Sequence, residues 1–151
     1  MKLQSQVFKH NGKIPSLYTC QGKNINPPLD ILDVPTEAKS LALIMDDPDV
    51  PEYIRKDGLY VHWILFDLDP KTQRIEEECA PSFGTLGKNT SGKSCYTGPC
   101  PPDREHRYFF KLYALDTWLL LPAGIEKRQL LQAMEGHILA ECELMGRFEK
   151  S

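Results

Sequence analysis

Five polar side chains in this sequence have the types and spacing that could recognise a charged ligand. They are Asp47, Asp49, His62, His106 and Tyr108. Imidazole N–H and phenol O–H groups donate hydrogen bonds to anions, whereas carboxylates accept hydrogen bonds or orient a neighbouring histidine. Four of them, Asp47, His62, His106 and Tyr108, stand at or near the end of a hydrophobic segment. A few polar groups at the rim of an apolar core are typical of small-molecule pockets, so the pattern predicts a binding site.

Each of these residues also has an ordinary structural explanation when it is taken alone. A histidine in a strand is more often a hydrogen-bonded core residue than a ligand contact. Asp47-Pro48-Asp49 has the composition of a common turn. The prediction of a site therefore depends on the fold bringing the five residues together.

Two catalytic alternatives would use overlapping residues. Two histidines and two aspartates could form a two-histidine, carboxylate site for zinc or iron, but no H-E-x-x-H or comparable ligand spacing is present. Cys100 and His106 could form a nucleophilic pair, but Pro99 and Pro101 flank the cysteine rigidly. We therefore expect a protein that is not an enzyme and that has no metal site and no cofactor.

The five cysteines are an odd number and include no C-x-x-C pair. This pattern argues against a disulfide framework and against a four-cysteine zinc site. We expect free thiols, as in proteins of a reducing compartment, with a bridge between Cys95 and Cys100 as a minor alternative.

Length and composition indicate one globular domain, residues 1–151, because 41% hydrophobic and 26% charged residues are ordinary for such a domain. A formal net charge of -3 gives no reason to expect nucleic-acid binding. No apolar run has the length of a signal peptide or a membrane span, so we expect a cytoplasmic protein without stable membrane insertion.

Three hydrophobic segments predict the strands that would position the candidate residues. They are residues 40–45, 60–68 and 107–115, and their almost continuous hydrophobicity indicates burial on both faces. Weaker strands are expected at residues 3–8 and 74–77.

Strand alternation assigns the candidate residues to faces. His106 and Tyr108 fall on the apolar face of their strand, because the other face carries Arg107 and Lys111. Asp47 continues the apolar face of residues 41, 43 and 45. By the same alternation, His62 is expected to share a face with residues 64 and 66.

The end of the chain reads as a helix over residues 126–148. Its apolar side chains follow a helical stripe, although Gly136 and Gly146 weaken it by about 1 kcal/mol each relative to Ala. We expect this helix to cover one edge or face of the sheet. The stretch 79–102 predicts a long loop with a functional role.

Taken together, the motifs resemble the phosphatidylethanolamine-binding protein family, in particular its compact bacterial and archaeal, YbhB/YbcL-like branch. The resemblance rests on D-P-D-V-P at 47–51, H-W at 62–63, G-P-C-P-P at 98–102 and H-R-Y at 106–108. Their order and spacing match over nearly the whole chain.

The resemblance implies a mostly β fold, with two antiparallel sheets in a β-sandwich, a C-terminal helix and few other helices. It also implies an anion pocket for phosphate or a phospholipid head group such as phosphorylethanolamine. By motif, the ligand-binding residues would be Asp47, Asp49, His62, Gly98, Cys100, Pro102, His106 and Tyr108.

These residues suggest a division of roles within the pocket. His106, Tyr108 and the backbone N–H groups near Gly98 would donate to the anion. Asp47 would hold a histidine in its donor form, and Asp49 would accept from a ligand ammonium or hydroxyl group.

Some relatives are described as inhibitors of a kinase or protease, so regulation of a protein partner is the alternative function. The charged segment 52–57 and the terminal helix are where such a partner would bind. A homodimer is also compatible with the sequence.

Overall fold

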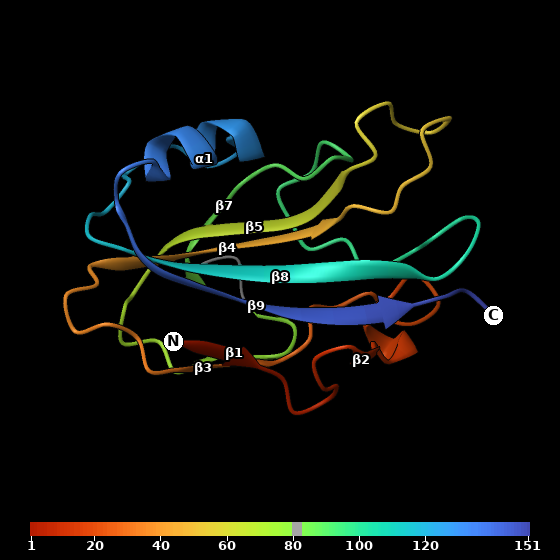
Figure 1. Ribbon diagram of the computed structural model, residues 1–151, viewed down its shortest axis with the longest axis horizontal. Helices are drawn as coiled ribbons and strands as arrows, with labels where there is room; N and C mark the ends of the chain where they lie inside the picture. The colour runs from red at the N-terminus through yellow and green to blue at the C-terminus, as the bar shows by residue number, and fades with distance from the viewer. Residues whose placement is uncertain (80–82) are drawn as a thin grey trace.

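The structure is a computed structural model that describes residues 1–79 and 83–151, arranged as two sheets and one α-helix (Figure 1). The larger sheet has the strand order β2 (Gly12–Lys13), β9 (Ile138–Phe148), β8 (His106–Leu115), β4 (Ser40–Asp47), β5 (Tyr60–Leu68) and β7 (Thr85–Leu86). The smaller sheet has the order β1 (Lys2–Gln4), β3 (Leu29–Leu32) and β6 (Arg74–Ile75). A 3₁₀ turn spans Ser16–Tyr18 and helix α1 spans Lys127–Met134.

The two sheets are antiparallel apart from the two-residue β2, which pairs parallel to β9. The expectation of a mostly β sandwich with a C-terminal helix is confirmed. The strands predicted at 40–45, 60–68 and 107–115 are β4, β5 and β8, and every residue of β4 is buried. The two weaker predictions correspond to the shorter β1 and β6.

The core has two layers, one on each face of the larger sheet. On one face, β4 and β8 side chains pack with Leu29 and Ile75 of the smaller sheet. On the other face, Ile44 and Phe66 pack under Leu130 and other side chains of α1. Figure 1 shows the resulting order of helix, large sheet and small sheet.

The prediction of one helix over 126–148 is wrong in its extent. Helix α1 ends at Met134, Gly136 has φ +80°, and the chain then runs back as β9 beside β8. The apolar side chains of this stretch fit a helical period, but pairing with β8 overrides that local pattern. Gly146 suits the strand, because an added Cβ there would lie 2.5 Å from Cγ1 of Ile14.

Among the described residues, no helix has the length and apolar character needed to cross a lipid bilayer.

Candidate functional site

A cavity of about 210 Å³ lies where two connections meet at one end of the larger sheet. The connections are residues 48–59, between β4 and β5, and the segment that leads into β8, and both project from the same end in Figure 1. Every predicted site residue except Asp49 lines this cavity. The lining residues are Asp47, Val50, Ile54, Tyr60, His62, Thr97, Gly98, Cys100, Pro101, Pro102, His106 and Tyr108.

A larger groove of about 720 Å³ lies between α1 and residues 88–92. Its lining mixes cations such as Lys88 and Arg128 with anions such as Asp57 and Glu135. In the described part of the chain, none of the buried polar side-chain atoms without a hydrogen-bond partner belongs to a residue of this groove. We therefore place the candidate site at the smaller cavity.

His106 is held between two carboxylates. Its Nδ1 lies 2.6 Å from Oδ2 of Asp47, and its Nε2 lies 2.7 Å from Oδ1 of Asp103. A neutral imidazole has only one N–H group, so two such contacts require the imidazolium form or a proton on one carboxyl group. The ring is 1% exposed, so water cannot replace either carboxylate as its partner without a rearrangement.

Asp47 has the orienting position predicted for it. Its second carboxylate oxygen, Oδ1, accepts a 2.8 Å hydrogen bond from the backbone N–H of Asp49. Burial raises the pKa of Asp47, while the hydrogen bonds from the Asp49 amide and from His106 act in the opposite direction. The carboxylate therefore shapes the turn after β4 and holds the imidazole at the same time.

Asp49 does not line the cavity, and its carboxylate binds Arg107. The guanidinium donates to both oxygens at 2.8 and 2.9 Å, and the Arg107 backbone N–H adds a bond of 2.8 Å. Hydrogen bonds from the Arg107 side chain lower the pKa of Asp49. The predicted role of Asp49 as acceptor for a ligand ammonium is thus replaced by a bidentate ion pair that joins the ends of β4 and β8.

His62 reaches the cavity by a route that alternation does not predict. Between Met45 and Asp46 the partner in β5 changes from Trp63 to Val61, which is a β-bulge at His62. Residues 64 and 66 pack under α1, whereas His62 lines the cavity on the opposite side of the sheet. The expectation that His62 shares a face with residues 64 and 66 is therefore wrong, although its place in the site holds.

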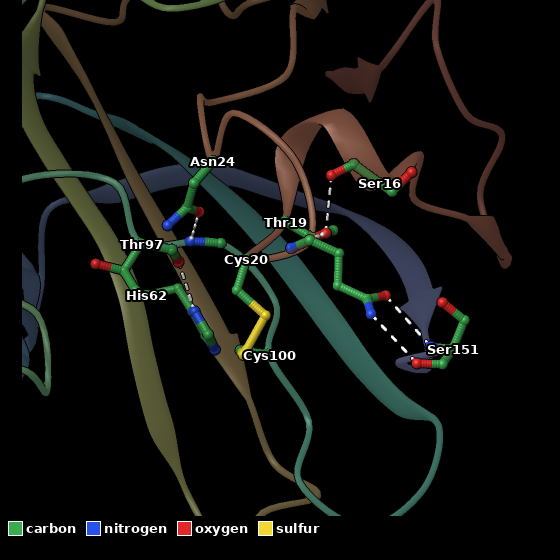
Figure 2. Close-up of a disulfide and its surroundings, with 10 residues drawn as sticks. Ser16, Thr19, Cys20, Asn24, His62, Thr97, Cys100 and Ser151 are labelled. Carbon is green, nitrogen blue, oxygen red and sulfur yellow. Dashed lines mark hydrogen bonds between the residues drawn. A yellow bond between two sulfur atoms is a disulfide. The ribbon is translucent and has the colours of Figure 1, made fainter.

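The hydrogen bond from His62 to the carbonyl oxygen of Thr97, drawn in Figure 2, fixes the tautomer of the ring. A carbonyl only accepts, so Nδ1 carries the hydrogen and Nε2 of the neutral ring is an acceptor. Burial lowers the pKa of His62 to about 4, despite the opposing effect of the Thr97 bond. His62 is accordingly neutral near pH 7.

The Tyr108 hydroxyl is the unused donor of the site. It is buried, it has no hydrogen-bond partner among the described residues, and its side chain lines the cavity. Burial, followed by the charges of Asp47 and Asp49, raises the pKa of Tyr108, so the phenol keeps its proton. An unpaired buried hydroxyl costs free energy that a ligand oxygen would recover.

Few backbone donors remain in the wall formed by residues 98–102. The Gly98 N–H donates to Oδ1 of Asn24 at 2.7 Å, and the prolines have no N–H group. Among the described residues we find no partner for the Cys100 N–H. Gly98 is required for close approach, because an added Cβ would lie 2.2 Å from the Tyr18 carbonyl oxygen.

Cys100 forms a disulfide with Cys20, which corrects the expectation of free thiols and of a Cys95–Cys100 bridge (Figure 2). Spacing along the chain could not reveal this pair, because its two cysteines are 80 positions apart. Cys79, Cys95 and Cys142 are free. Disulfides persist in oxidising compartments, so the thiol content no longer supports a cytoplasmic location.

Asp103 is the site residue that the sequence reasoning missed. It lies in a loop outside the predicted strands, and its contact with His106 depends on how residues 100–105 return to β8. The only indication in the sequence was that Asp103 stands three positions before His106, which is close enough for a contact. Among the described residues, no group of three or more histidine, cysteine or acidic side chains is arranged to hold a metal ion.

The chain is similar to known proteins over nearly its whole length. The chain matches the family model for phosphatidylethanolamine-binding protein over residues 4–149. The UPF0098 protein of Chlamydia muridarum is 53% identical over 150 residues, with 99% of both chains covered. A UPF0098 protein of Methanothermobacter thermautotrophicus is 48% identical over 156 residues, again with 99% of both chains covered.

Two solved structures share the fold. A phosphatidylethanolamine-binding protein homologue, CT736, from Chlamydia trachomatis superposes with a TM-score of 0.96 at 51% identity, covering 99% of this chain and 97% of that one. YbcL of Escherichia coli superposes with a TM-score of 0.88 at 22% identity, covering 99% and 98%. The matches confirm the resemblance seen in the motifs, and the chain belongs to the phosphatidylethanolamine-binding protein family.

Proposed function

We propose that this protein binds a small phosphorylated ligand, such as phosphate, a phosphate ester or the head group of a phospholipid, without chemically changing it. The observation that carries the proposal is the buried Tyr108 hydroxyl, which has no partner among the described residues and lines the same cavity as His106. A phosphate oxygen would accept from this hydroxyl and recover the cost of its burial.

The size of the cavity favours a head group rather than a whole lipid. Pockets for drug-sized molecules occupy roughly 300–1,000 Å³, and this cavity has about 210 Å³. Phosphorylethanolamine has the right dimensions, whereas acyl chains of a phospholipid would have to remain outside.

The donors and acceptors of the cavity are suited to a ligand that carries both kinds of group. Tyr108 can donate, while the neutral His62 offers an acceptor at Nε2. Among its described lining residues there is no lysine or arginine. An anion would therefore be bound by oriented dipoles rather than by lysine or arginine side chains, and His106 could contribute only if one of its two carboxylate partners moved aside.

Binding without catalysis is supported by the state of the nucleophile and base candidates. Cys100 is bonded to Cys20, so its sulfur is not a thiolate nucleophile. Both nitrogens of His106 contact carboxylates, so the ring has no free position for a cysteine partner.

Calorimetric titration with phosphorylethanolamine and with inorganic phosphate tests the proposal. We expect Tyr108→Phe to weaken binding about 10- to 150-fold, because a hydrogen bond to a charged group contributes roughly 1.5–3 kcal/mol. Tyr113→Phe is the matched control, since Tyr113 lies on the opposite face of β8 and outside the cavity. Absence of binding to either compound by the parent protein would refute the proposal.

A regulatory role toward a protein partner remains the second candidate. Tyr53 is 81% exposed and Ile54 is 48% exposed on the connection beside the cavity, and Ile54 also lines it. These two neighbouring apolar side chains would be available to a protein partner. Kinase and protease assays with the purified protein, with and without phosphorylethanolamine, would reveal inhibition and its dependence on the cavity.

A further inference from the structure

Asp103 occupies the position at His106 that an anionic ligand would need. Its Oδ1 lies 2.7 Å from Nε2 of His106, and the other ring nitrogen already faces Asp47. An anion can receive the Nε2–H hydrogen bond only when the Asp103 carboxylate moves aside. The resting site therefore contains an internal competitor for phosphate.

The exposure of the Asp103 side chain allows its carboxylate to move away from His106. Its side chain is 29% exposed, whereas the side chains of His106 and Asp47 are 1% and 4% exposed. Its second oxygen makes only a long contact of 3.8 Å with Nε of Arg104, whose side chain is 61% exposed. Asp103 does not itself line the cavity, but it contacts His106, which does, so its carboxylate can move away from Nε2 while His106 keeps its contact with Asp47.

The displaced carboxylate would then lie beside the bound phosphate. A phosphate monoester carries about −1.5 to −2 charges at pH 7, so an unpaired carboxylate close to His106 would repel it. A ligand that brings its own cation removes this repulsion. Asp49 is not placed to serve that cation, because it lies outside the cavity lining and both of its oxygens already accept from Arg107.

We propose that Asp103 is the specificity-determining residue of this cavity and selects zwitterionic phosphorylated amines over simple phosphate esters. On binding, the ligand phosphate replaces Asp103 as the partner of His106, and the ligand ammonium replaces His106 as the partner of Asp103. The Asp103–His106 ion pair is thereby replaced by two ion pairs, one between the phosphate and His106 and one between the ammonium and Asp103. This inference rests on the proposed function, and it assigns the ammonium to Asp103 in place of Asp49.

Two ligands that differ only in the amine provide the test. Phosphorylethanolamine and ethyl phosphate share the phosphate monoester and the two-carbon chain. For the parent protein we expect phosphorylethanolamine to bind about tenfold more tightly, a difference of ~1.4 kcal/mol. In Asp103→Asn we expect ethyl phosphate to bind several-fold more tightly and the preference between the two ligands to disappear.

Glu52→Gln is the control for net charge. Glu52 is an exposed acid in the connection beside the cavity, outside its lining, so its loss changes the charge by the same amount without touching His106. We expect it to preserve the preference for phosphorylethanolamine. Circular dichroism of both variants establishes that they are folded.

The outcomes separate the inference from the function on which it rests. If parent and Asp103→Asn bind both ligands with the same discrimination, Asp103 does not determine specificity, although the cavity binds phosphate esters. If neither ligand binds to either protein, the proposed function itself fails. The NMR resonance of the His106 Nε2–H group reports the exchange directly. A shift of this resonance both in ligand-free Asp103→Asn and on adding phosphorylethanolamine to the parent protein supports the exchange. An unchanged resonance in both experiments contradicts it.

Discussion

At the residue scale, the candidate site is built from side chains that meet a structural requirement of the fold and also line the cavity. Asp47 shapes the turn after β4 and also orients His106. His62 binds the Thr97 carbonyl through Nδ1 and leaves Nε2 as an acceptor. Tyr108 is the exception, because its hydroxyl is buried without a partner in the described part of the chain. That exception is why a ligand oxygen is expected there.

The burial of His62 predicts a loss of stability in acid. Its folded-state pKa of about 4 lies below the ordinary value of 6.5, so the unfolded chain binds the proton first as the pH falls. The contribution of His62 to the free energy of unfolding is fully present above about pH 6.5. It is lost as the pH falls to about 4, by about 3 kcal/mol in total. Urea unfolding at several pH values, compared with His62→Asn, should isolate this contribution. Identical pH profiles for the two proteins would contradict it.

At the element scale, a buried charge fastens α1 to the larger sheet. Asp46 of β4 is 1% exposed, and its Oδ2 lies 2.7 Å from Nζ of Lys127 at the start of the helix. Lys111 of β8 approaches the other oxygen at 3.4 Å. Asp46 and Asp47 thus point to opposite faces of the sheet, one toward the helix and one toward the site.

Replacing Lys127 should therefore loosen the helix. We expect Lys127→Met to lower the free energy of unfolding by about 1–3 kcal/mol, less than for a fully buried pair because Lys127 is partly exposed and Lys111 remains. Urea denaturation measures the change. The exposed Lys88→Met should have almost no effect, and equal stability of both variants would show that the pair contributes nothing.

At the scale of the whole molecule, the Cys20–Cys100 disulfide joins distant parts of the chain beside the cavity. The Cys20 N–H also donates to the Pro99 carbonyl at 3.1 Å, and the Tyr96 hydroxyl donates to the Tyr18 carbonyl at 2.7 Å. The segment after the 3₁₀ turn thereby supports the wall of the site (Figure 2).

Removing this disulfide should destabilise the whole fold. Because the loop that it closes is long, we expect Cys20→Ser with Cys100→Ser to lower the free energy of unfolding by about 2–5 kcal/mol. Thermal unfolding of the double variant and of the reduced parent should agree. Cys95→Ser, which removes an exposed free thiol, should behave as the parent. Alkylation of all five cysteines without reductant would show that the bond does not form.

The sequence by itself determined the central strands, because β4, β5 and β8 are hydrophobic runs whose burial on both faces leaves little choice of conformation. It also placed Asp47, His106 and Tyr108 in one cavity, since the ends of adjacent strands meet and alternation fixes which side chains share a face.

Only the tertiary structure decided the features that depend on contacts between distant residues. Pairing with β8 made a strand of residues 138–148, and a bulge against β4 turned His62 toward the site. The Cys20–Cys100 disulfide and the Arg107–Asp49 ion pair also depend on the tertiary structure, because they join residues 80 and 58 positions apart. Local patterns record the conformational preferences of short segments, whereas these contacts exist only once the sheets have packed together.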